Sequence, residues 1–235
     1  MKRTMDHKNE DTLYFIKNRI IVLMILCFSL SATAQKLTGK WIVYNGAEVY
    51  STCHVYEFEK RKLNIYNFDQ FYTTTKTKIN YRKGAFTRDM EHAGRIEDLV
   101  IKFKINGDVL FFTEESVNDY VFENHPILQL MKLVPTQMHA DLSEVEGHSF
   151  LIKNDATEKT IIDLKKSSCE TRTDPNNLAC NFTKIEKIDD TYFLVLFYNR
   201  SKREEALVIK EIHKDKIVVY VPTSDKAKTI TLQKV

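Results

Sequence analysis

The hexapeptide EDLVIK at residues 97–102 recurs as EALVIK at residues 205–210, which is 108 positions later and identical at five of six residues. The same shift places Leu-Thr-Gly at residues 37–39 on Val-Glu-Gly at residues 145–147. Similarity at a fixed spacing is typical of a repeated structural unit. The sequence therefore predicts two copies of one unit.

The ends of the two copies also agree. LMKL at residues 130–133 matches LQKV at residues 232–235 once the second copy is shortened by six residues. We therefore expect a first domain over residues 35–134, a linker over residues 135–144 and a second, divergent domain over residues 145–235.

Apolar residues alternate with polar ones along both copies. His54, Tyr56 and Phe58 alternate with Val55 and Glu57, which is the period of a half-buried β-strand. Turn signals at short intervals favour antiparallel meanders in a barrel or sandwich. We predict an all-β fold of two tandem small antiparallel β-barrels, with one larger barrel or sandwich built from both repeats as the alternative. The turn signals are Asn45-Gly46, Lys83-Gly84, Asn106-Gly107-Asp108, Asp174-Pro175-Asn176-Asn177, Asp189-Asp190 and Lys214-Asp215-Lys216.

Two other segments have local signals of their own. The continuous apolar run YFLVLFY at residues 192–198 is short and rich in β-forming residues, so it predicts a strand that is covered on both faces. Residues 89–98 lack a clear period and are compatible with a turn of helix.

The start of the chain resembles an export signal. Basic residues precede an uncharged, mostly apolar run at residues 20–30, and Ala32-Thr33-Ala34 follows it as a processing site of the A-x-A type. The run is shorter than the roughly 20 residues that a membrane-spanning helix needs. We expect a signal peptide over residues 1–34, cleavage before Gln35, a periplasmic or secreted location and no transmembrane helix in the mature protein. The basic residues are Lys2, Arg3, Lys8, Lys17 and Arg19.

The charge balance excludes one class of partner. Without residues 1–34 the chain has 30 basic and 29 acidic residues, a net charge of +1. Binding to nucleic acid requires clustered Lys and Arg. We therefore expect no nucleic-acid partner.

Leu37-Thr38-Gly39-Lys40-Trp41 directly follows the expected signal peptide. This segment resembles the G-x-W opening strand of lipocalin-like (calycin-type) exported β-barrel proteins of Bacteroidetes. The resemblance covers residues 37–134 and, more faintly, residues 145–235. It implies an eight-stranded barrel in which Gly39 and Trp41 belong to the closing position, with a lumen for an apolar ligand. The second copy has no tryptophan, and Phe150 stands one place late.

The cysteines are consistent with an oxidising compartment. Cys169 and Cys180 lie symmetrically about Asp174-Pro175, so a regular hairpin would place them opposite each other as a disulfide. Their spacing does not match a zinc motif. We interpret Cys53 as a buried thiol that packs as a small apolar side chain.

Known catalytic and metal-binding motifs are absent from the sequence. It contains no nucleophile elbow, zinc-protease motif, phosphate loop or dinucleotide fingerprint, and the histidines show no ligand-like spacing. We expect neither an enzyme nor a bound metal or cofactor.

Aromatic side chains remain as candidates for a ligand site. Tyr56 and Phe58 share one face of a strand, Tyr66 and Phe68 share another, and Phe103 lies on the face of its strand that carries apolar residues. Such a set fits either a lumen for an apolar ligand or a filled core. We predict that the protein binds a small apolar molecule. The alternative is a protein–protein interaction module of the cell envelope, a scaffold or an inhibitor.

Overall fold

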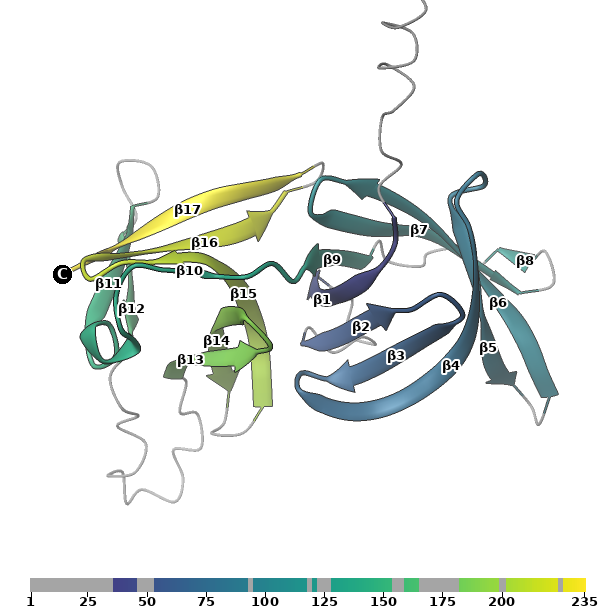
Figure 1. Ribbon diagram of the computed structural model, residues 1–235, viewed down its shortest axis with the longest axis horizontal. Coiled ribbons are helices and arrows are strands. Elements are labelled where there is room, and N and C mark those ends of the chain that lie inside the picture. Colours follow the sequence, from purple (N-terminus) through teal and green to yellow (C-terminus); the bar gives the residue numbers. More distant parts are fainter. Residues whose placement is uncertain are drawn as a thin grey trace, which may run out of the picture. The chain divides into compact units, whose positions relative to one another are not determined.

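The computed structural model describes residues 36–45, 53–92, 95–117, 120–121, 128–153, 159–164, 182–198, 202–223 and 226–235. The chain from Leu37 to Val235 forms one compact unit (Figure 1). The expected signal peptide at residues 1–34 lies outside the described residues.

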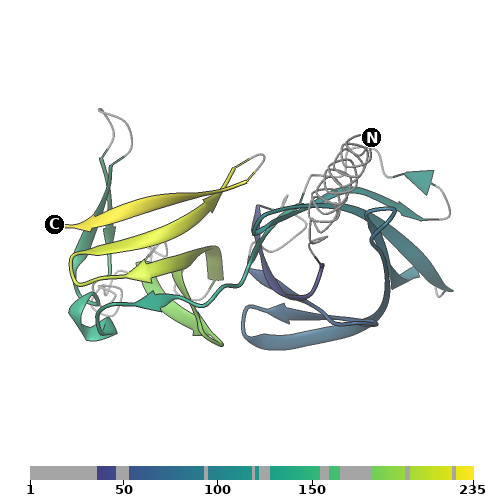
Figure 2. The ribbon, with the colours of Figure 1, turned by 45° about the horizontal axis from the view of Figure 1, so that its top comes forward.

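The first half of the described chain forms a closed barrel of antiparallel strands (Figures 1 and 2). Its strands are β1 (Gly39–Asn45), β2 (His54–Phe58), β3 (Lys62–Asn67), β4 (Gln70–Asn80), β5 (Ala85–His92), β6 (Arg95–Asn106), β7 (Val109–Val117), β8 (Tyr120–Val121) and β9 (Leu128–Lys132). The order around the ring is β6-β5-β4-β3-β2-β1-β9-β7, and β7 pairs back with β6. The short β8 pairs with β7 beside the ring. This is an up-and-down barrel, in which strands adjacent in the chain are adjacent in space.

Alternation along these strands fills the barrel with apolar side chains. Trp41, Phe58 and Leu110 lie in its interior cluster and are at most 2% exposed. Residues next to them, such as Ile42 and Val109, belong to a different apolar cluster outside the barrel. One face of each strand therefore builds the barrel core.

The second half forms a barrel-like sheet that is nearly closed. Its strands are β11 (Ser149–Lys153), β12 (Lys159–Asp163), β13 (Phe182–Ile188), β14 (Thr191–Tyr198), β15 (Lys202–Ile212), β16 (Lys216–Pro222) and β17 (Ala227–Lys234). The order is β12-β11-β17-β16-β15-β14-β13, and among the described residues no pairing joins β12 to β13. The 3-10 turn η1 (Leu142–Glu144) precedes this sheet. The two-barrel prediction is confirmed, and the single larger barrel is wrong because each half of the chain has its own sheet.

The two sheets have the same strand order except for one strand. Without β3, the first ring runs β4-β5-β6-β7-β9-β1-β2, which matches β13-β14-β15-β16-β17-β11-β12 in the second sheet. Gly39 and Gly147 open the two units with φ values of +83° and +82°, a backbone region that favours glycine. No described strand of the second sheet therefore corresponds to β3 of the first.

Local predictions had mixed outcomes. Gly107 with φ +60° and Asp189 with φ +50° lie in the turns after β6 and β13, as the turn signals predict. The prediction for β14 is also confirmed, because Leu194 packs into the second barrel while Phe193 and Val195 pack into the cluster outside it. The turn of helix considered for residues 89–98 is wrong, because β5 and β6 occupy this segment.

Residues 133–148 connect the two sheets, and part of this connection pairs with the second one. The short strand β10 (Gln137–Met138) runs parallel to β15, with Gln137 opposite Glu211 and Met138 opposite Ile212. The Thr136 hydroxyl donates a hydrogen bond to the Ile209 carbonyl at 2.7 Å. This part of the expected linker is therefore bonded to the end of β15.

Candidate functional site

A cavity of about 520 Å³ lies against the inner face of the second sheet. Five strands, β11 to β15, supply its walls, and most of the side chains are aliphatic. The lining residues are Ile152, Ile161, Ile162, Asp163, Phe182, Thr183, Leu194, Leu196, Glu205 and Leu207. The volume falls within the usual range for small-molecule sites, about 300–1,000 Å³.

Strand periodicity explains how the sequence builds the walls. Leu194 and Leu196 are two residues apart on β14, and Glu205 and Leu207 are two residues apart on β15, so each pair points to one face. Glu205 and Leu196 are direct cross-strand neighbours. The wall at this position therefore combines an apolar surface with one carboxyl group.

Two acidic residues give the cavity its polar character. Burial is the main cause that raises the pKa of the Glu205 carboxyl above its ordinary value, and the charge of Glu204 raises it further. The second carboxylate, Asp163, accepts a hydrogen bond from the Ser149 hydroxyl. The Glu205 carboxyl therefore loses its proton less readily than an ordinary glutamate side chain.

The position of the cavity follows from the difference between the two sheets. In the first barrel, β3 fills the space between β2 and β4 and directs Leu63 and Ile65 into the core, where they are 0% and 6% exposed. The second sheet has no described strand at this place, and the cavity is lined there by β12 and β13. The connecting residues 165–181 lie outside the described residues.

Three of the five aromatic candidates lie in the core of the first barrel. Tyr56 and Phe58 are 5% and 2% exposed, and Phe103 packs against the same cluster. Their rings make edge contacts with other core rings, at 6.0 Å between Tyr56 and Phe112 and 5.2 Å between Phe58 and Phe86. None of the three lines the 520 Å³ cavity.

The other two candidates face away from the interior of the first barrel. Phe68 is 2% exposed in the cluster outside the barrel, and Tyr66 packs against that cluster. The Tyr66 hydroxyl donates a hydrogen bond to Glu57 Oε2 at 2.6 Å. The sequence correctly separated this pair from Tyr56 and Phe58, but neither residue lines the large cavity.

The remaining predicted residues have different outcomes. Trp41 lies in the core of the first barrel, two residues after Gly39, and its indole Nε1 has no hydrogen-bond partner among the described residues. Cys53 is 1% exposed and packs in an apolar cluster, in agreement with its interpretation as a buried thiol. The predicted disulfide cysteines, Cys169 and Cys180, and the expected cleavage residues, Ala32 and Ala34, lie outside the described residues.

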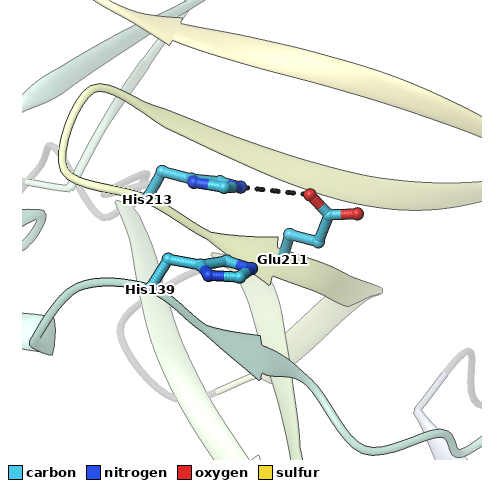
Figure 3. Close-up of side chains that lie close together, drawn as sticks. All are labelled: His139, Glu211 and His213. Atoms are coloured by element: carbon cyan, nitrogen blue, oxygen red, sulfur yellow. Dashed lines mark hydrogen bonds and ion pairs between the residues drawn. The ribbon is translucent and has the colours of Figure 1, made fainter.

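A second group of functional side chains lies at the end of β15 (Figure 3). His139, Glu211 and His213 place one possible ligand atom each within 4.8 Å of one another. The two imidazole rings stack with centroids 4.4 Å apart and an angle of 14° between their planes. His213 Nε2 and Glu211 Oε2 are 3.0 Å apart. Two imidazoles and one carboxylate are groups that bind transition metals.

The sequence interpretation missed this group. Its local signal is Glu211-Ile212-His213, because residues two apart on a strand point to the same side. The third member is 72 positions earlier, in the expected linker. Only the parallel pairing of β10 with β15 brings His139 to the other two.

Comparisons with known proteins add no family. No protein-family model matches the chain, and no curated protein or solved structure is detectably similar to it. Within the described part of the chain, no helix has the length and apolar character needed to span a membrane.

Proposed function

We propose that this protein is an exported, non-enzymatic binding protein that holds a small apolar molecule in the second barrel. The observation that carries the proposal is the cavity of about 520 Å³ with its mainly aliphatic lining. Ligand sites are typically concave and apolar, with a few polar groups that fix orientation. The export signal in the sequence and the resemblance to lipocalin-like proteins support the same function.

The cavity wall also indicates the chemistry of the ligand. Leu194, Leu196 and Leu207 offer an apolar surface, and Glu205 adds one polar anchor to it. Burying apolar ligand surface against such a wall contributes roughly 25 cal/mol per Å² before the costs of association. We propose a ligand with an apolar body and one polar end.

Binding of the apolar dye N-phenyl-1-naphthylamine, followed by its fluorescence, tests the site. Leu196→Trp adds bulk at the half-buried wall and should weaken dye binding by about tenfold or more. Ile96→Trp is the matched control, because Ile96 is 77% exposed on the first barrel and its replacement should leave binding unchanged. Equal binding by both variants and the unaltered protein would contradict the proposed site.

Native mass spectrometry of the protein purified from its own host tests the class of ligand. A co-purifying lipid or other small apolar molecule supports the proposal. A co-purifying protein supports the second candidate, an interaction module. That candidate rests on Phe71 and Tyr72, neighbouring aromatic residues on β4 that are 62% and 70% exposed.

A further inference from the structure

We propose that His139, Glu211 and His213 form a binding site for a divalent transition-metal ion of the zinc type. The site is separate from the apolar cavity, and the proposal does not depend on the function of that cavity. The three side chains converge from two segments of the chain (Figure 3).

Backbone hydrogen bonds hold His139 in place. The peptide N–H of His139 donates to the carbonyl of Ile212 at 2.8 Å, directly after the parallel pairing of Met138 with Ile212. Thr136 fixes the segment from the other side, because its hydroxyl accepts a hydrogen bond from the N–H of Tyr192 at 2.8 Å. The stacking of His139 on His213 is therefore set by the backbone as well as by side-chain rotamers.

A β-bulge in β15 directs the other two groups outward. Ile209 and Ile212 are both 0% exposed, although residues three apart on a regular strand point to opposite faces. The pairing register with β16 shifts between Ile209 and Glu211, so Lys210 is the additional residue. Bulges re-aim side chains in this way. Glu211 and His213 consequently lie on the outer side, next to His139.

The group has the donor atoms that a metal of this class requires. Neutral imidazole nitrogens and a carboxylate oxygen bind Zn²⁺ at about 2.0–2.2 Å, and two His and one Glu are a known zinc ligand set that leaves a position open. Ligand atoms around a tetrahedral ion are about 3.3 Å apart at these bond lengths. The present spacing of at most 4.8 Å closes to this value by side-chain rotation, to which the exposed His139 is well suited.

Lys210 completes the arrangement. Its Nζ lies 3.0 Å from Glu211 Oε1, whereas His213 Nε2 approaches the other oxygen, Oε2. Outer partners of this kind orient a ligating carboxylate. The Lys210 contact thus presents Oε2 toward the two histidines. A bound ion would join β10 to β15 and fasten the connection between the two sheets.

Isothermal titration of the purified, metal-stripped protein with Zn²⁺ tests the site. We expect saturable binding of one ion per chain, weakened by about tenfold or more in His139→Ala and in His213→Ala. His148→Ala is the matched control, because His148 is an exposed histidine of the same barrel that lies outside the cluster. Mg²⁺ should not compete, because it prefers oxygen ligands in octahedral geometry.

Thermal melting gives a second readout. Zn²⁺ should raise the melting temperature of the unaltered protein and of His148→Ala but not of His139→Ala, since only a ligand of the folded state stabilises it. Circular dichroism of each variant without metal establishes that it is folded. The proposal is overturned by an absence of saturable Zn²⁺ binding, by unchanged affinity in both His139→Ala and His213→Ala, or by an equal loss in His148→Ala.

Discussion

Phe150 of the second barrel occupies the position that Trp41 holds in the first. Trp41 pairs with Lys132 on β9, and Phe150 pairs with Lys234 on β17. The backbone N–H groups of these two lysines donate hydrogen bonds to equivalent turn carbonyls, that of Asp108 at 2.9 Å and that of Asp215 at 2.8 Å. Both aromatic side chains are buried in their barrel interiors. Phe150 stands one residue later after Gly147 than Trp41 does after Gly39, but its strand pairing places it at the equivalent position.

Replacement of Phe150 by alanine should be strongly destabilising. Phe150 is 0% exposed, and removal of a fully buried phenylalanine costs about 3–5 kcal/mol in lost burial and cavity formation. Urea unfolding followed by circular dichroism measures the loss. Phe71→Ala is the matched control, because Phe71 is 62% exposed and should cost no more than about 1 kcal/mol. A similar loss in both variants would contradict the role assigned to Phe150.

Glu205 should make stability depend on pH. Its pKa is raised in the folded protein, first by burial and then by the charge of Glu204, so folding favours the protonated form. The stabilisation is present below the unfolded-state pKa of about 4.3 and is lost as the pH rises through the higher folded-state pKa. Glu205→Gln, which stays neutral, should therefore gain melting temperature relative to the unaltered protein at pH 7 but not at pH 4. The same difference at both pH values would contradict the raised pKa.

The Tyr66 phenol should lose its proton at a higher pH than an ordinary tyrosine. Its hydrogen bond to Glu57 and, to a smaller extent, its burial raise the pKa of Tyr66 to about 12. Folding favours the protonated phenol, so the associated stabilisation is lost between about pH 10 and 12. NMR of the tyrosine ring carbons follows the titration, with Tyr66→Phe to assign the signal. Glu57→Gln should shift the midpoint toward 10, and a midpoint near 10 in the unaltered protein would refute the interaction.

The Cys169–Cys180 disulfide stays a prediction from the sequence. Closing a loop of this size should stabilise the protein by roughly 2–3 kcal/mol. Replacing both cysteines with serine should then lower the melting temperature by several degrees. Peptide mapping without reduction tests the bond directly. Free thiols at both positions, or a link from either one to Cys53, would show that the predicted hairpin or compartment is wrong.

The two barrels could be predicted from the sequence because the repeated hexapeptide and the alternation of apolar and polar residues are both visible in short stretches of it. Leu99 and Leu207, which the 108-residue shift aligns, both face a barrel interior, on β6 and β15. The shift fails in the following hairpin, where Val109 faces outward and its aligned residue Ile217 faces inward. The bulge at Lys210 adds one residue to β15, and a bulge leaves no periodic mark in the sequence.

The candidate sites depend on relations that the sequence does not display. The aromatic residues of the first copy fit a lumen or a core equally well, and the presence of β3 decides for a packed interior. The cavity of the second copy lies where no described strand corresponds to β3, and its lining is mainly aliphatic. The group around His139 requires a parallel pairing between residues 74 positions apart, which no local pattern encodes.

Among the described residues no pairing joins β12 to β13, and this bears on how a ligand of the proposed site would be exchanged. In the first barrel the ring of strands is continuous, so neighbouring strands separate only when backbone hydrogen bonds break. In the second sheet, β12 and β13 separate without the loss of any described hydrogen bond between them. Amide protons along these two strands should therefore exchange with solvent faster than those of β1 and β9. For a ligand in the proposed site, we expect release on the timescale of this local opening, so that residence time and affinity depend on different residues.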